Sequence, residues 1–170
     1  MGCGQSAETH PVRTPVPEGV TRICIAGYRV SHHTGRARKI AALVAKKYGD
    51  KYETWFYWNS GGKFYQFTGE VFSAVTFPDH LKGHDSSPFV WFETSAAGAT
   101  NKIEPIGGRI ELAAWALKTF PDDKELPELC SAGGPPLFCD ATCHAGLSCC
   151  AIDEAEYGPS YQRQKLAAPH

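Results

Sequence analysis

The sequence predicts an α/β domain in which a mixed four-stranded β-sheet is flanked by helices. Three observations predict it. The predicted folded domain begins with a strand, an amphipathic helix and a second strand, an order that favours two parallel strands joined by a short crossover. A helical stretch, a strand, a hairpin region with a short strand and a closing helix follow. The 170 residues, 42% of them hydrophobic, suffice to bury a real core.

The opening strand–helix–strand unit is predicted from hydrophobic periodicity. Residues 21–28 (TRICIAGY) are predicted to form a buried strand. Residues 35–49 (GRARKIAALVAKKYG) carry apolar side chains at helical spacing and end in glycine, so they predict an amphipathic helix. Residues 53–58 (ETWFYW) are aromatic and β-branched, which predicts the second strand. A turn then leads to a short helical stretch around residues 71–75.

The remaining elements complete the sheet and its cover. Residues 88–93 (PFVWFE) predict a third strand, because proline is tolerated at a strand's first residue. Residues 95–108 predict a hairpin or turn region with a short strand at 102–104. Residues 111–120 (ELAAWALKTF) predict the closing helix.

The sequence predicts that the chain is divided into three parts. Residues 1–20 form a proline-rich tail, residues 21–120 the folded domain, and residues 121–170 a cysteine-rich extension without periodicity. A net charge of −1 provides no overall positive charge for sequence-independent binding of nucleic acid, so no nucleic-acid partner is expected. Without a secretory signal the chain is expected to be cytoplasmic, with its seven cysteines mostly reduced. No cofactor is expected.

Three short motifs stand at informative places. SHHT (31–34) precedes the first helix, SSPFVWF (86–92) leads into the third strand, and IGGRIEL (106–112) leads into the last helix. Over residues 21–120 this order resembles the glutaredoxin branch of the thioredoxin fold. The resemblance implies that Pro88 follows a cis peptide bond and that SHHT occupies the place of the reactive C-x-x-C motif.

SHHT cannot perform the family's dithiol chemistry. A thiolate at a helix N-terminus attacks disulfides because unpaired backbone N–H groups lower its pKa. Ser31 and Thr34, in the places of the two cysteines, carry hydroxyls that stay protonated at neutral pH. His32 and His33 are poor substitutes, because a cation at a helix N-terminus is disfavoured. One of the two hydroxyls is expected to cap the helix, which contributes about 1 kcal/mol.

The resemblance also implies a remnant of the family's glutathione pocket. Its residues would be Ser87, Pro88, Gly107, Gly108 and Arg109. The family usually has an acidic or small polar pair after the two glycines, and the pair Arg109–Ile110 departs from that pattern. Two alternatives therefore stay open: these residues bind glutathione, or they only maintain the fold.

The first residues, MGCGQS, fit a lipidation motif. Gly2 is the expected myristate acceptor and Cys3 a palmitate acceptor, which together would provide the two acyl chains that stable membrane anchoring requires. This start resembles that of dually acylated flagellar-membrane proteins of trypanosomatid protists. The alternative is a chance match to a short pattern.

The cysteine-rich extension offers a candidate zinc site. Reduced thiols and an imidazole can bind zinc tetrahedrally, and the candidate ligands are Cys139, Cys143, His144 and Cys149. Paired C-x-x-C spacing is absent, however. The alternative is a loop whose small thiols pack as hydrophobic groups against a partner.

Two surface features suggest protein partners. The first helix carries Arg36, Arg38, Lys39, Lys46 and Lys47 without an intervening acid, which suits either a solvated face or an acidic partner such as anionic lipid or tubulin. Seven aromatic residues crowd residues 55–67, more than one sheet face needs, so some are expected to lie in an interface.

The sequence thus favours a non-catalytic glutaredoxin-like subunit of a larger assembly. A flagellar or ciliary axoneme, with tubulin or other axonemal proteins as partners, is one expected location, and the inner face of the flagellar membrane is the other. The alternatives are a glutathione-dependent thiol oxidoreductase and a membrane-anchored glutathione-binding protein. Cys24 is a poor nucleophile candidate because it lies in the middle of a buried strand.

Overall fold

The computed structural model describes residues 13–28, 32–59, 62–73, 75–84, 86–96 and 100–131. Within them the chain forms nine elements: β1 (Thr21–Tyr28), α1 (His32–Lys47), β2 (Tyr52–Asn59), α2 (Gly62–Phe72), the 3-10 turn η1 (Asp79–Leu81), β3 (Phe89–Thr94), β4 (Lys102–Gly107), α3 (Arg109–Thr119) and α4 (Leu126–Cys130).

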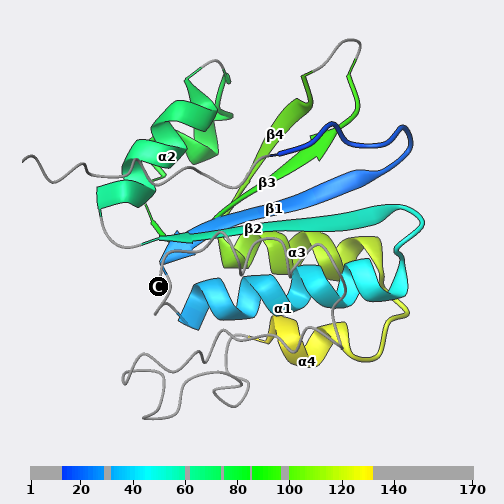
Figure 1. Ribbon diagram of the computed structural model, residues 1–170. Helices are drawn as coiled ribbons and strands as arrows, with labels where there is room; N and C mark the ends of the chain where they lie inside the picture. The colour runs from blue at the N-terminus through cyan, green and yellow to red at the C-terminus, as the bar shows by residue number, and fades with distance from the viewer. Residues whose placement is uncertain are drawn as a thin grey trace, which may run out of the picture.

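The four strands form one mixed sheet in the order β2-β1-β3-β4 (Figure 1). β1 pairs in parallel with β2 and antiparallel with β3, and β3 pairs antiparallel with β4. β1 is therefore an interior strand, which explains why Ile23, Cys24 and Ile25 are almost completely buried. The predicted α/β architecture, a mixed four-stranded sheet flanked by helices, is confirmed.

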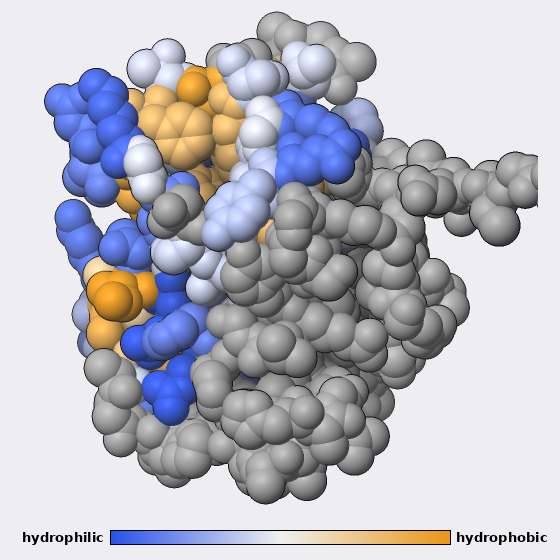
Figure 2. All heavy atoms as spheres, turned by 90° about the vertical axis from the view of Figure 1, so that its left-hand side faces the viewer, coloured by the Kyte–Doolittle hydropathy of each residue, from blue (hydrophilic) through white to orange (hydrophobic). Residues whose placement is uncertain are grey.

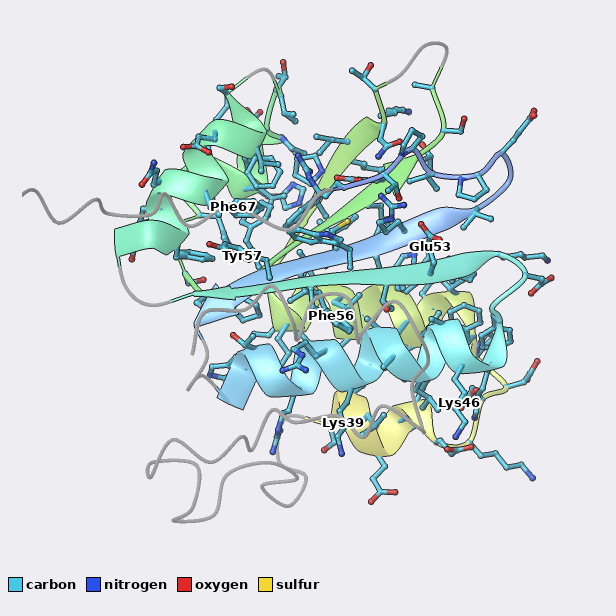
Figure 3. The ribbon with its side chains drawn as sticks, in the orientation of Figure 1. Lys39, Lys46, Glu53, Phe56, Tyr57 and Phe67 are labelled. Atoms are coloured by element: carbon cyan, nitrogen blue, oxygen red, sulfur yellow. The ribbon has the colours of Figure 1, made fainter. Side chains whose placement is uncertain are left out.

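Helices α1, α3 and α4 lie together on one face of the sheet (Figure 1). Alternate strand residues reach this face, and Phe56 of β2 points between the sheet and α1 (Figure 3). The core of this layer draws apolar side chains from every adjoining element: Ile23, Ile25, Ile40, Val44, Phe56, Val90, Leu112 and Leu126.

The opposite face of the sheet is aromatic and is partly covered by α2 (Figure 1). Tyr57 of β2 points towards Phe67 of α2, with ring centroids 4.6 Å apart (Figure 3). The buried members of this aromatic layer are Trp55, Tyr57, Phe64, Phe67, Phe72, Phe89 and Trp91. Figure 2 shows the side of the molecule that lies on the left in Figure 1. Among the residues described there, hydrophobic residues are exposed in separate places with hydrophilic residues between them. The aromatic run between residues 55 and 67 therefore builds a second core.

Helix α2 is the main departure from the predicted elements. The sequence predicts a turn that leads to a helical stretch at 71–75, whereas the helix runs from Gly62 to Phe72. Phe64 and Phe67 stand three residues apart and pack on the sheet, and this tertiary contact outweighs the low helix propensity of Gly62 and Gly69. Helix α1 also begins at His32, three residues before the predicted start.

The packed unit extends beyond residues 21–120 on both sides. Val16, in the predicted N-terminal tail, is 4% exposed. Beyond residue 120, α4 packs on α1 and α3 with Leu126 completely buried. One turn of helix is too short to show periodicity, which is why the sequence gives no sign of it. Within the described ranges, no helix is long and apolar enough to cross a membrane.

Candidate binding sites at the two ends of β1

Three chain segments meet where β1 ends: the first turn of α1, the loop before β3, and β1 itself. Thr34 is 1% exposed, and its Oγ1 lies 3.1 Å from Ser87 Oγ, within hydrogen-bond distance. The peptide bond between Ser87 and Pro88 is cis, as the glutaredoxin resemblance implies. Gly27 lies beneath both hydroxyls, and we call these four residues the cis-proline site.

Only glycine fits at position 27. A Cβ added there would lie 2.4 Å from Thr34 Oγ1 and 2.9 Å from Ser87 Oγ, both far inside van der Waals contact. The close approach of β1 to the hydroxyls therefore depends on the missing side chain. The residue of α1 that contacts the cis-proline loop is Thr34, which carries a hydroxyl and not a thiol.

The other members of the SHHT motif are placed differently. His32 and His33 belong to the first turn of α1, and His33 is exposed. Ser31 lies outside the described residues. The first turn contains no acidic residue, so no carboxylate complements the positive end of the helix dipole there.

The predicted pocket residues after β4 lie beside the cis-proline loop. Gly107 has a φ of +129°, a conformation that side-chain-bearing residues rarely adopt, and this fixes the turn into α3. The Gly108 N–H donates to Glu111 Oε2 at 2.7 Å. A Cβ on Gly108 would lie 3.5 Å from the Pro88 carbonyl oxygen. The structure therefore brings Ser87, Pro88, Gly107 and Gly108 together.

Two further residues complete the surroundings of this site. Arg109 is 8% exposed, and its charge lowers the pKa of Cys130 against the larger effect of burial. Its Nε has no hydrogen-bond partner in the described part of the chain. His84, which the sequence analysis did not single out, is within hydrogen-bond distance of Ser86 (Nε2 to Oγ, 3.3 Å) and lies against Gly108. A loop histidine carries no sequence signal for such a position.

The two described cysteines are protected thiols. Burial raises the pKa of Cys24 well above its ordinary value, and the charge of Glu93 adds to the effect. Burial likewise raises the pKa of Cys130 to about 11, against the opposing charge of Arg109. Neither forms a thiolate at neutral pH. Cys3 and Cys150 lie outside the described residues.

The candidate zinc ligands Cys139, Cys143, His144 and Cys149 also lie outside the described residues. Within the ranges that the structure describes, no group of three or more histidine, cysteine, aspartate or glutamate side chains is arranged to hold a metal ion. The predicted acylation sites Gly2 and Cys3 precede the first described residue.

Several basic residues of α1 make contacts within the protein. Arg36 donates to the Ser131 carbonyl at 3.1 Å, and the Arg38 guanidinium lies 5.3 Å from the ring centroid of Phe56. Lys47 forms ion pairs with Asp123 and Glu125. Only part of the run therefore faces outward, where Lys39 and Lys46 point away from the sheet (Figure 3).

Asp123 is the centre of the cluster at the C-terminal end of α1. Burial opposes its charged form, but hydrogen bonds from Lys47, from the backbone N–H groups of Glu125 and Leu126, and from Tyr48 outweigh that effect. The pKa of Asp123 is therefore held at about 2. The loop between α3 and α4 is fastened to α1 through this carboxylate.

A second polar site lies at the other end of β1, on the aromatic face of the sheet. The strand register places Arg22 opposite Glu53 of β2 and opposite Glu93 of β3. Arg22 donates to Glu53 Oε1 at 2.6 Å and to Glu93 Oε2 at 3.3 Å. The Glu93 side chain is only 1% exposed, so its charge is almost completely removed from water.

The sequence alone does not predict this network of Arg22, Glu53 and Glu93. The three charged residues are separated by 31 and 71 positions along the chain, and only the register of the sheet brings them together. The one local signal is that Arg22 and Glu93 are charged residues directly beside the apolar runs of β1 and β3.

No protein-family model matches this chain, and neither a curated protein nor a solved structure gives a significant match.

Proposed function

We propose that the chain is a glutaredoxin-like domain of the thioredoxin fold that lacks thiol chemistry and serves as a binding or structural subunit of a larger assembly. The observation that carries the proposal is the contact between Thr34 and Ser87 at the cis-proline site. It is supported by the strand order β2-β1-β3-β4 and by the position of α1 beside the cis-proline loop. A hydroxyl in that place neither attacks nor forms a disulfide.

A thiol–disulfide exchange assay tests the absence of catalysis. Full-length protein is incubated with glutathione and hydroxyethyl disulfide, and glutathione oxidation is followed through glutathione reductase and NADPH. We expect no turnover above the buffer rate, because the described thiols are buried. Turnover that disappears when one cysteine, for example Cys139, is replaced by serine would overturn the proposal in favour of an oxidoreductase.

One observation favours a second candidate function, a membrane-anchored glutathione-binding protein. Ser87, Pro88, Gly107 and Gly108 converge beside the first turn of α1, where the resemblance implies a glutathione pocket. Isothermal titration of the full-length protein with reduced glutathione distinguishes the two functions. Heat of binding that Gly108→Val abolishes, with the fold intact by circular dichroism, would establish the second function, and a flat titration would exclude it.

The proposed location is a flagellar or ciliary axoneme, with tubulin or other axonemal proteins as partners, or the inner face of the flagellar membrane. It is supported by the motif at Gly2 and Cys3 and by the outward-facing Lys39 and Lys46. The test is fractionation of native cells with non-ionic detergent, applied to the wild type and to Gly2→Ala.

The two locations give different fractionation results. Retention of both proteins in the detergent-resistant cytoskeleton would support the axonemal subunit. Release of the wild type by detergent, together with release of Gly2→Ala by buffer alone, would support the acyl anchor. Buffer alone releasing both proteins would overturn both locations.

A further inference from the structure

Residues 13–16, here called the N-terminal strap, lie across the aromatic face of the sheet. In Figure 1 this dark blue segment crosses the strands on the side that also carries α2. The strap is held by side chains of the sheet and of Asn101, which directly precedes β4. Within the described residues the strap makes no backbone–backbone hydrogen bond to a strand. It can therefore leave without breaking the sheet.

Arg13 of the strap occupies a cage built from two indole rings and a carboxylate. Its guanidinium carbon lies 5.9 Å from the ring centroid of Trp55 and 5.8 Å from that of Trp91. Its Nη1 donates to Glu93 Oε1. Aromatic faces attract a planar, weakly hydrated cation, and a buried carboxylate neutralises it. We call Trp55, Trp91 and Glu93 the arginine cage.

The cage carboxylate is held in place by groups that do not belong to the strap. Trp91 Nε1 donates to Glu93 Oε1 at 3.0 Å, and Asn101 Nδ2 donates to Glu93 Oε2 at 2.9 Å. Arg22 supplies a third contact at 3.3 Å. Glu93 therefore keeps its position and a charge partner when Arg13 leaves, so the cage is preorganised for a guanidinium.

The backbone of the strap is also recognised. The Asn101 amide contacts both sides of Pro15: its Oδ1 accepts from the Val16 N–H at 2.9 Å, and its Nδ2 donates to the Thr14 carbonyl at 3.1 Å. Arg22 donates to the same carbonyl at 2.6 Å and to Thr14 Oγ1 at 3.2 Å. Main-chain hydrogen bonds between two anchored side chains, here Arg13 and buried Val16, are how proteins bind extended peptides.

We propose that this face of the sheet is a binding site for an extended, arginine-bearing peptide segment, and that Arg13–Val16 is its resident occupant. The ligand it takes from a partner is a segment of the same chemistry: an arginine followed by a short extended stretch with an apolar residue three positions on. The site lies at the end of β1 remote from the cis-proline site and stands independently of the proposed function.

The test uses the full-length chain with the contacts between its own strap and the arginine cage weakened. In the double variant Arg13→Ala/Val16→Ser both anchors are lost, while the cage and Asn101 are unchanged. The probe is the peptide acetyl-Arg-Thr-Pro-Val-Pro-Glu-Gly-amide, and binding is followed by tryptophan fluorescence, since Trp55 and Trp91 line the cage. We expect saturable binding to the double variant and at least about tenfold weaker binding to the wild type, whose strap competes from within the molecule.

Two controls isolate the cage. A peptide with citrulline in place of arginine keeps the shape but loses the charge, and it should bind about tenfold more weakly or worse because the cation–π contact and the charge-assisted hydrogen bond are lost. Glu93→Gln in the double-variant background should reduce the preference for arginine over citrulline without abolishing it, because the carboxylate is lost while Trp55 and Trp91 still attract the cation. Equal binding of the two peptides to the double variant would overturn the arginine cage.

A second variant tests the proposal if the double variant does not fold. If circular dichroism shows that the double variant is unfolded, the full-length variant Arg13→Lys replaces it, because lysine keeps the charge but lacks the planar fork that suits the cage. The arginine peptide should then displace the strap with a larger fluorescence response than in the wild type. A folded variant that gives no response to the peptide would overturn the proposal.

Discussion

Adding a methyl group at Gly27 tests how closely β1 approaches the cis-proline site. In Gly27→Ala the new Cβ would lie 2.4 Å from Thr34 Oγ1 and 2.9 Å from both Thr34 Cγ2 and Ser87 Oγ. The φ of Gly27 lies outside the left-handed region, so alanine meets no backbone strain and the cost is steric. Overpacking of this kind costs about 1–3 kcal/mol, and the shortest contact places this case near the upper end.

A second substitution should remove most of that cost. Thr34→Ala deletes two of the three atoms in conflict, and Ser87 Oγ can then rotate away because its Thr34 partner is gone. Gly27→Ala should therefore cost less than about 1 kcal/mol in the Thr34→Ala background, a coupling of about 2 kcal/mol. Thr34→Ser is the matched control: it removes Cγ2 but keeps Oγ1 at the shortest distance, so it should rescue little.

The assay is urea unfolding followed by far-UV circular dichroism, with the four members of the Gly27/Thr34 cycle and the serine control measured under one condition. Each free energy of unfolding comes from the midpoint and slope of the transition. If the costs of Gly27→Ala and Thr34→Ala simply add, the three segments do not meet as described. The Thr34 hydroxyl would then not lie against Ser87 of the cis-proline loop.

Three other predictions concern the rest of the fold. In Asp123→Asn, the loss of stability relative to the wild type should be present above about pH 4 and should fade as the pH drops towards 2. The folded pKa is lowered from 3.8 to about 2, so the carboxylate stabilises the fold only above the unfolded value; a deficit independent of pH in urea unfolding would contradict this. Cys24 and Cys130 should resist iodoacetamide at pH 7.5 in native protein and react in urea, as measured by peptide mass spectrometry, and rapid native labelling of either would show that burial does not protect it. Phe67→Ala should cost about 3–5 kcal/mol and Tyr65→Ala no more than about 0.5 kcal/mol, because Phe67 is buried and Tyr65 is 51% exposed; similar unfolding midpoints would refute the aromatic layer beneath α2.

Local pattern predicted the elements with strong periodicity and failed where tertiary contacts decide. The run TRICIAGY gave β1 with the observed bounds, because an interior strand is apolar throughout. Helix α2 was missed because its two glycines suggest a turn, and only the sheet beneath Phe64 and Phe67 makes the helix favourable. Helix α4 was missed because one turn has no period to detect.

The cis-proline site and the arginine cage also differ in how far the sequence predicts them. For the cis-proline site, the glutaredoxin resemblance implied the cis bond before Pro88 and the grouping of Ser87, Pro88 and Gly108, whereas the contact between Thr34 and Ser87 was not predicted. The arginine cage could not be predicted, because it depends on strand register and on a segment whose prolines suggest a tail. Composition alone cannot distinguish a free tail from one whose Val16 is buried and whose Arg13 meets a buried carboxylate.

Strand β1 is the physical link between these sites, and its rigidity decides whether they act independently. Arg22 and Gly27 are five residues apart, which in a strand is about 17 Å. Substitutions separated by more than about 7–10 Å without shared partners usually add. The stability effects of Gly27→Ala and Arg13→Ala should therefore be additive within about 0.5 kcal/mol in urea unfolding. A larger coupling would mean that β1 shifts as one body when the strap leaves, and peptide binding at the cage would then alter the cis-proline site.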